Sequence, residues 1–214
     1  MTRNIADLRK DYKKERLTGE NLPEEPFSFF EAWFNQALET EGFEANAMHL
    51  ATTGENGKPT LRVVLLKGFD EKGFVFFTNY ESEKGRHLKQ NPFCALNFFW
   101  AGLERQVRIE GKAEKVSVAE SEEYFDSRPE YSRIAAIASP QSQIVESREE
   151  LEQKFSDVEK KWQEKPLKRP PHWGGYRVKP ERIEFWQGRE SRFHDRIRYT
   201  HLENKEWTRH RLAP

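Results

Sequence analysis

Hydrophobic positions alternate with polar ones in several short runs of this chain, and this pattern predicts a sheet of short strands. Asn56-Gly57 and Asp70-Glu71-Lys72-Gly73 are typical turn sequences between such runs. The expected strands span residues 47–53, 60–67, 74–79, 94–100, 106–115, 175–178, 182–187, 196–200 and 207–212, the last two forming a hairpin. Short strands at such close spacing predict an antiparallel barrel.

Other segments carry apolar residues at helical spacing, so the expected fold class is α+β, dominated by β. Pro26 begins the first of these helices, which carries an aromatic stripe. Ser117 and Ser147 are predicted N-caps of two later helices. Short helices are expected at 82–91 and 131–138. We expect residues 1–25, which are charged and weakly patterned, to form a mobile arm, and residues 26–214 to form a single domain.

Composition narrows the class of protein. Lys+Arg and Asp+Glu both number 36, so nothing in the net charge suggests nucleic-acid binding. Cys94 is the chain's one cysteine and lies in an apolar run, which fits a small core residue in a reducing compartment. No run is long and apolar enough to predict a membrane span or a signal peptide. We therefore expect a soluble, cytoplasmic protein.

The segment from Ile183 to Arg196 concentrates aromatic and cationic side chains. If it is extended, Arg192, His194 and Arg196 project from one face, because alternate side chains of a strand share a face. Three such groups beside Trp186 suit a flat, anionic, aromatic ligand. A salt-bridged strand end with Trp186 in the core explains the same residues equally well.

Two further groups of residues could bind phosphate. Arg62 and Lys67 lie at the two ends of an apolar strand, where each could hold an anion or simply reach solvent. Tyr124, Arg128 and Ser132 recur at four-residue spacing, with Pro129 expected to interrupt the helix. A phenol, a guanidinium and a hydroxyl could clamp a phosphomonoester. Spacing alone favours a scatter of surface residues.

The run Trp186-Gln187-Gly188, followed by Arg192-Phe193-His194-Asp195-Arg196, resembles the C-terminal signature of the pyridoxamine (pyridoxine) 5′-phosphate oxidase family. The chain also ends Arg211-Leu212-Ala213-Pro214, as members typically do. The resemblance implies an FMN-binding split β-barrel with flanking helices. It also implies a homodimer with FMN sites at its interface, with pyridoxamine 5′-phosphate, pyridoxine 5′-phosphate and O2 as reactants.

The same resemblance implies which residues contact FMN. Arg62 and Lys84 correspond to phosphate ligands, Gln106 to a ligand of the flavin ring, and Gln141 with Ser142 to a pair from the partner subunit. Glu83 departs from the family pattern, because many relatives carry an arginine there and a carboxylate repels phosphate. The implied FMN residues are Arg62, Val63, Val64, Leu65, Leu66, Lys67, Phe77, Thr78, Lys84, Gln106, Gln141, Ser142, Trp186 and Arg196.

For the substrate, the resemblance implies a phosphate site made of Lys67 and the Tyr124–Ser132 group. Arg192 and His194 correspond to the residues that orient the reacting carbon, and we name them as the catalytic pair. The implied substrate residues are Arg9, Lys10, Asp11, Tyr12, Lys67, Tyr124, Arg128, Ser132, Arg192, Phe193 and His194.

The implied activity is oxidation of either substrate to pyridoxal 5′-phosphate, with H2O2 as a product. Two alternatives stay open. A split-barrel flavin reductase would act on a different substrate, and a carrier of FMN or pyridoxal phosphate would bind without turnover. No metal is expected, because no His, Cys or Asp cluster has the spacing of metal ligands.

Overall fold

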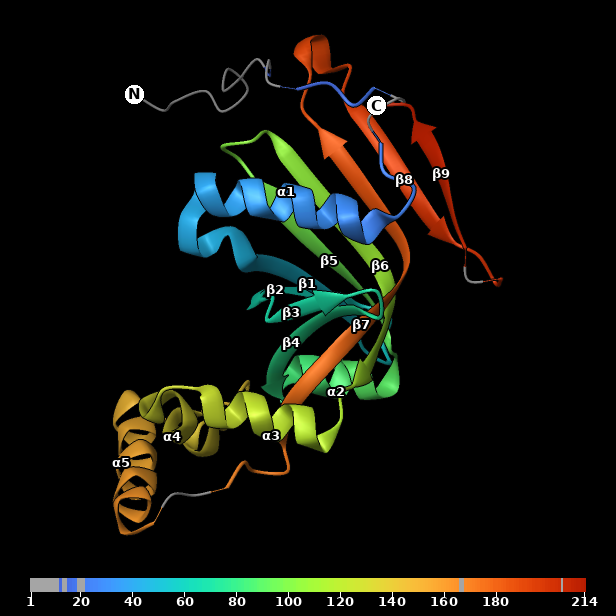
Figure 1. Cartoon of the computed structure of the whole chain (residues 1–214). Helices are drawn as coiled ribbons and strands as arrows, with labels where there is room; N and C mark the ends of the chain where they lie inside the picture. The colour runs from blue at the N-terminus through green and yellow to red at the C-terminus, as the bar shows by residue number, and fades with distance from the viewer. Residues whose placement is uncertain (1–11, 13–14, 19–21, 166–167, 205) are drawn as a thin grey trace, which may run out of the picture. The chain divides into compact units, whose positions relative to one another are not determined.

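The computed structural model describes residues 12, 15–18, 22–165, 168–204 and 206–214 (Figure 1). Within these residues there are five α-helices and nine strands. The helices are α1 (Pro26–Glu41), α2 (Glu83–Gln90), α3 (Val118–Ser127), α4 (Glu130–Ala138) and α5 (Arg148–Glu164). The strands are β1 (Ala47–Thr53), β2 (Pro59–Leu65), β3 (Gly68–Asp70), β4 (Gly73–Asn79), β5 (Phe93–Trp100), β6 (Arg105–Lys115), β7 (Trp173–Gln187), β8 (Asp195–His201) and β9 (Trp207–Leu212).

The strands are hydrogen-bonded in the order β2-β1-β5-β6-β7-β4-β3, and β8 joins β7 and β9. Strand β7 pairs antiparallel with β4 and with β8, with Phe76 opposite Tyr176 and Trp186 opposite Arg196. Strands β8 and β9 form the predicted hairpin. Segments far apart in the sequence therefore share one sheet.

The chain forms two compact units, and strands β1, β5, β6 and β7 have residues in both. The first unit comprises Met1–His49, Ala95–Glu110 and Pro180–Pro214. In it, the aromatic stripe of α1 packs on sheet residues: the Phe29 ring stacks on Phe185 with centroids 4.2 Å apart, and Phe30 lies 5.3 Å from Phe98. These side chains are buried and form the core of this unit.

The second unit comprises Leu50–Cys94 and Gly111–Lys179 and contains helices α2 to α5. The predicted serine caps are confirmed: Ser117 Oγ accepts from the Glu120 N–H, and Ser147 Oγ accepts from the Glu150 N–H. Ser82 Oγ caps α2 in the same way, accepting from the Gly85 N–H. Hydroxyl caps therefore fix the start of three helices in this unit.

Two sequence predictions of local structure were wrong. The runs 175–178 and 182–187 form one strand, β7, because the backbone stays extended through Pro180. Residues Glu190–Arg192 form a 3₁₀ turn in place of extended chain, with φ of 56° at Ser191 and 61° at Arg192. Arg192 therefore does not alternate with His194 and Arg196 along a strand.

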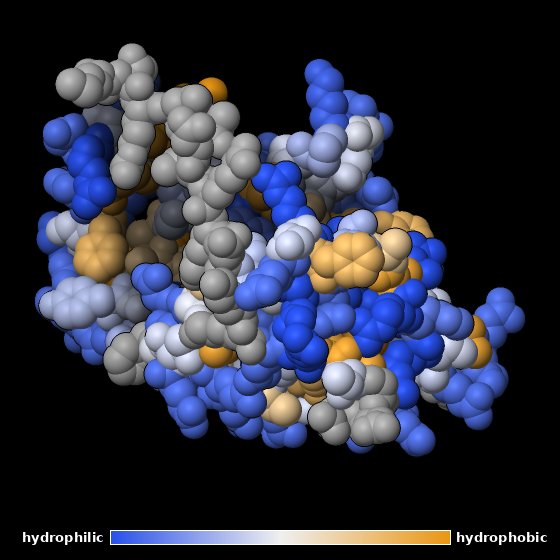
Figure 2. All heavy atoms as spheres, turned by 90° about the horizontal axis from the view of Figure 1, so that it is seen from above, coloured by the Kyte–Doolittle hydropathy of each residue, from blue (hydrophilic) through white to orange (hydrophobic). Residues whose placement is uncertain are grey.

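Hydrophilic side chains predominate on the face of the molecule shown in Figure 2, and hydrophobic ones gather there in small patches. None of the helices in the described ranges is long and apolar enough to cross a membrane.

Candidate active site

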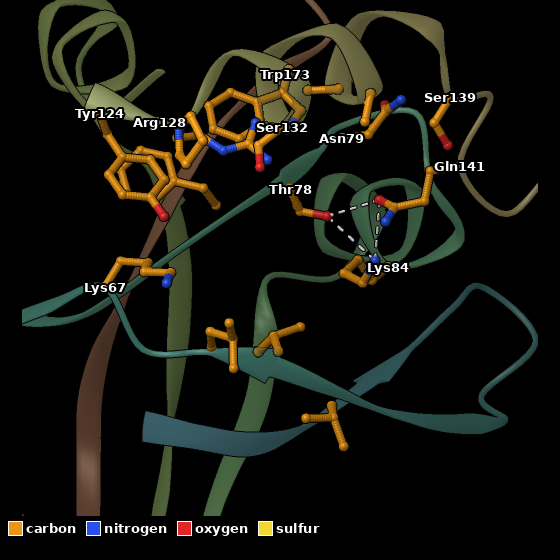
Figure 3. A pocket seen from close by; sticks show the side chains of 17 residues that line it. Lys67, Thr78, Asn79, Lys84, Tyr124, Arg128, Ser132, Ser139, Gln141 and Trp173 are labelled. Carbon is orange, nitrogen blue, oxygen red and sulfur yellow. Dashed lines mark hydrogen bonds between the residues drawn. The ribbon is translucent and has the colours of Figure 1, made fainter. Parts of the chain in front are cut away.

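A pocket of about 580 Å³ lies in the second unit (Figure 3). Its apolar lining comes partly from Val63, Val64 and Leu65 of β2. Polar and aromatic groups come from β4, α2, α4 and the start of β7, and from the segments that follow β2, surround the end of α3 and follow α4. The polar and aromatic lining residues are Lys67, Phe77, Thr78, Asn79, Lys84, Tyr124, Arg128, Ser132, Ser139, Gln141 and Trp173.

The arginine end of the pocket consists of Lys67, Tyr124, Arg128 and Ser132. Helix α3 ends at Ser127, and Pro129 is the N-cap residue of α4, so the predicted interruption at this proline is confirmed. The break leaves Arg128 between two helices with extended backbone, φ −77° and ψ 148°. A guanidinium, an ammonium and two hydroxyls therefore line one region, as a phosphomonoester clamp requires.

Arg128 has an unusual environment in this region. Its Cζ lies 4.7 Å from the centroid of the Trp173 ring, a cation–π distance. Its Nη1 is buried and has no hydrogen-bond partner within the described part of the chain. Burial lowers the pKa of Arg128, and the nearby Tyr124 partly offsets this effect. The site thus holds a partly desolvated positive charge with an unused donor.

An aromatic stack supports the arginine end. The rings of Phe77 and Tyr124 lie 3.9 Å apart with 22° between their planes, and Trp173 is near-parallel to both, at 5.7 and 6.1 Å respectively. The two residues after Trp173 are glycines, and a side chain at either position would clash with its neighbours. A Cβ at Gly174 would lie 2.2 Å from the Tyr80 hydroxyl, and one at Gly175 would lie 2.8 Å from the Phe77 ring.

The lysine end of the pocket consists of Thr78, Lys84 and Gln141. Lys84 Nζ donates to Thr78 Oγ1 at 3.3 Å and to Gln141 Oε1 at 3.4 Å, and Thr78 Oγ1 donates to the same amide oxygen. Burial, followed by repulsion from Arg62, lowers the pKa of Lys84 to about 8. Gln141 was expected to contact FMN from the partner subunit. In the structure its side chain lies beside Thr78 and Lys84 of its own chain.

Arg62 lies outside the lining of this pocket, although it was expected to bind phosphate there. Its guanidinium donates to Leu50 O, to Thr52 Oγ1 and to both oxygens of Thr60. Arg62 Nη2 also lies 3.2 Å from Glu83 Oε2. The guanidinium donors of Arg62 are therefore hydrogen-bonded to acceptors of its own chain, and Glu83 neutralises part of its charge.

In the first unit, the rings of Tyr12, Trp186 and His194 form a cluster. The His194 ring lies 4.7 Å from Trp186 and 5.8 Å from Tyr12. His194 Nδ1 accepts from the Arg189 N–H at 3.0 Å, so a neutral ring carries its proton on Nε2. Burial and the neighbouring Arg192 lower the pKa of His194, which favours this neutral form.

Other predicted site residues are placed as follows. Arg196 makes a bidentate ion pair with buried Glu184, at 2.9 and 3.2 Å, so its charge is already paired within its chain.

Arg192 and Phe193 are exposed, and Gln106 lies on β6 in the first unit. Ser142 has a left-handed φ of 68° after Gln141, and Leu66 is buried outside the pocket lining. Arg9, Lys10 and Asp11 lie outside the described residues.

Sequence reasoning missed Trp173, Asn79 and Ser139 as lining residues. The one available signal was the run Trp173-Gly174-Gly175 at the start of a strand. Two glycines beside a tryptophan indicate close packing, but they do not show that the indole ring lies next to Arg128.

The sheet and its flanking helices are those of a split-barrel protein. PhzG from Burkholderia lata, solved in complex with tetrahydrophenazine-1-carboxylic acid, superposes with a TM-score of 0.86 and 28% identity, covering 94% of this chain and 99% of that one. An FMN-binding protein from Nostoc punctiforme, described as related to pyridoxamine 5′-phosphate oxidase, shares the fold with a TM-score of 0.72 and 17% identity, over 90% of this chain and all of that one.

Sequence comparisons identify the family. Residues 34–162 match the pyridoxamine 5′-phosphate oxidase family, and residues 173–214 match the pyridoxine 5′-phosphate oxidase C-terminal dimerisation region. A pyridoxine/pyridoxamine 5′-phosphate oxidase from Pseudomonas syringae pv. tomato is 55% identical over the full length of both chains. One from Gloeothece citriformis is 54% identical over the same extent. The chain belongs to the pyridoxamine 5′-phosphate oxidase family.

Proposed function

We propose that this protein is an FMN-dependent oxidase that converts pyridoxamine 5′-phosphate or pyridoxine 5′-phosphate to pyridoxal 5′-phosphate. The observation that carries this proposal is the pocket of the second unit, which has cationic groups at both ends and apolar β2 side chains between them. Such a pocket suits two ligands that each combine a flat ring with a phosphate. The full-length identity to oxidases of this name supports the same substrates.

The lysine end fits the cofactor phosphate. Lys84 is a buried cation whose described partners, Thr78 and Gln141, are neutral, so its charge is available to an anion. It lies in the first turn of α2, where the helix dipole favours an anion. Val63 and Leu65 offer exposed apolar side chains to a flavin ring. When bound, FMN supplies the two-electron redox chemistry at C4′ of the substrate, with O2 as acceptor and H2O2 as product.

The arginine end fits the substrate phosphate. Arg128 provides in-plane donors, Lys67 provides a second cation, and the hydroxyls of Tyr124 and Ser132 complete the clamp. Binding of the phosphate then orients the pyridine ring. This orientation matters because a small displacement of the reacting carbon lowers the reaction rate.

Arg192 and His194 are the proposed catalytic pair. His194 in its neutral form carries the proton on Nε2 and can donate a hydrogen bond to a ring substituent. We propose that the active enzyme is a homodimer with its FMN sites at the interface, since the chain carries the family's dimerisation region. Trp186 and Arg196 belong to that region and are the proposed FMN contacts from it.

The test is an absorbance spectrum of the purified protein, followed by anaerobic addition of pyridoxamine 5′-phosphate. We expect a flavin band that bleaches with the substrate and returns on admission of air, with one H2O2 formed per turnover. A protein that binds no flavin contradicts the proposal.

A second candidate is a flavin enzyme acting on a different substrate, and the likeness to PhzG favours this alternative. The two functions differ in what the arginine end binds. A flavin band that pyridoxamine 5′-phosphate and pyridoxine 5′-phosphate both leave unchanged would favour this second candidate.

A further inference from the structure

Trp173 is a buried indole in the lining of the pocket. Arg128 Cζ lies over this ring, 4.7 Å from its centroid. The same ring is near-parallel to Tyr124 and Phe77 and meets Phe125 edge-on at 5.4 Å, so three neighbours restrict its rotation. A fixed aromatic surface therefore lies beside the guanidinium.

We infer that Trp173 is a positioning residue: it holds the Arg128 guanidinium in the pocket and thereby sets the affinity for the substrate's phosphate ester. This inference rests on the proposed function, because it requires a phosphorylated substrate at the arginine end.

The physical reason lies in the geometry of the guanidinium. Its five N–H donors lie in one plane, and a cation–π contact with an indole ring involves no hydrogen-bond acceptor oxygen, so donors of Arg128 stay available to an anion. The buried Nη1 without a partner in the described chain is such a donor. Leaving it unpaired is costly, and a phosphate oxygen removes that cost. Trp173 keeps the charge desolvated and in place until the anion arrives.

The chain provides a matched control for the contact itself. Arg133 Cζ also lies 4.7 Å from the centroid of a buried tryptophan ring, Trp162, in the same unit. Neither Arg133 nor Trp162 lines the pocket. Removing each indole therefore removes an arginine–tryptophan contact of the same length, and only one of the two should affect binding of a phosphate ester.

The experiment uses Trp173→Leu, Trp173→Phe and Trp162→Leu in the full-length protein with FMN at saturation. Calorimetry gives the Kd of 4-deoxypyridoxine 5′-phosphate, an analogue that lacks the oxidisable group, and of unphosphorylated 4-deoxypyridoxine. Steady-state kinetics with pyridoxine 5′-phosphate gives KM and kcat. Trp173→Met, which keeps much of the volume without an aromatic face, serves if the leucine variant does not fold.

We expect Trp173→Leu to raise the Kd of the phosphorylated analogue by about tenfold, since a desolvated cation–π contact and the positioning it provides are lost. KM should rise in parallel and kcat should change less. Trp173→Phe, which retains an aromatic face, should stay within about threefold of the parent. The Kd of the unphosphorylated analogue should be the same for Trp173→Leu as for the parent. Trp162→Leu should bind both analogues as the parent does.

Three results would overturn the inference. In the first, folded Trp173→Leu or Trp173→Met binds the phosphorylated analogue as tightly as the parent. In the second, both analogues lose affinity equally, which indicates a general packing role. In the third, the parent protein binds FMN but not the phosphorylated analogue, and the proposed substrate fails as well. The parent and variant titrations thus separate failure of the inference from failure of the proposed function.

Discussion

The two ends of the pocket differ in how far the chain has already paired their charges. At the lysine end, Lys84 has two neutral oxygen partners, and the nearby Arg62 is bonded to its own chain and to Glu83. At the arginine end, Arg128 lies against an indole ring and keeps a buried donor without a described partner. An incoming phosphate must compete with internal partners at the first end but not at the second.

This difference has a consequence for specificity. A desolvated positive charge with an unused donor binds an anionic group strongly and discriminates against ligands that have no anionic group. A charge already held by neutral acceptors gains less from the same anion. We therefore expect phosphate recognition to depend more on Arg128 than on Lys84.

The largest expected effect is that of Arg128→Ala. Loss of a charged donor should raise KM for pyridoxine 5′-phosphate by about 100-fold, because hydrogen bonds to charged groups are among the strongest in a buried site. The free energy of unfolding should not fall by a comparable amount, since the variant also removes a buried donor, Nη1 of the half-buried Arg128, that has no partner in the described chain. Kinetics and denaturant unfolding check the two parts. Arg133→Ala is the control, and an unchanged KM in Arg128→Ala would contradict this account.

Lys84→Ala should have the next largest effect, on the cofactor. We expect the Kd of FMN to rise by about 30-fold and that of riboflavin, which lacks the phosphate, to change little. Quenching of flavin fluorescence measures both constants. Lys89→Ala, an exposed lysine of the same helix, provides the control. Equal losses for FMN and riboflavin would show that Lys84 contacts something other than the phosphate.

The pH dependence of FMN affinity is the next effect, and near neutrality it should be smaller than the effect of Lys84→Ala. The pKa of Lys84 is lowered to about 8, so the free protein loses this charge as the pH rises through that value. Affinity should be nearly constant between about pH 6.5 and pH 7, where the FMN phosphate is largely a dianion, and should then fall, approaching tenfold per pH unit above the pKa of Lys84. Burial and Arg62 favour deprotonation, whereas Glu83 opposes it. Lys84→Arg, which stays charged, should flatten the profile; an unchanged profile in this variant would assign the titration to another group.

Glu83→Gln should have the smallest effect. The Arg62–Glu83 pair is partly exposed, with 48% of the Glu83 side chain accessible, so its net contribution is small. Removing the carboxylate should tighten FMN binding by about threefold, because a negative charge near the phosphate is lost. Glu81→Gln, an exposed neighbour, is the control. Weaker binding in Glu83→Gln would mean that the carboxylate holds Arg62 in a productive position.

Much of the fold could be predicted from the sequence because its signals are local. Alternating hydrophobic residues predicted most of the strands, although the short strand β3 was missed and β7 was divided in two, and the serine caps marked the helix starts to within a residue. The break at Pro129, which lets Tyr124, Arg128 and Ser132 share one pocket, followed from proline's missing N–H and its clash with a preceding turn.

The rest depended on non-local contacts or on conformations that residue identity does not specify. Ser191 and Arg192 adopt positive φ, which alternation could not indicate. The pairing of Arg62 with Glu83 joins residues 21 positions apart through the fold. The contact between Arg128 and Trp173 arises where the segment after α3 meets the start of β7, and no local pattern predicts it.

The central claim is that the two ends of the pocket hold two different phosphates. A crystal structure with FMN and 4-deoxypyridoxine 5′-phosphate tests it most directly. We predict the phosphate of the substrate analogue within hydrogen-bonding distance of Arg128 and Ser132, and the FMN phosphate beside Lys84. The analogue's phosphate bound away from Arg128, or the FMN phosphate bound away from Lys84, would contradict the account.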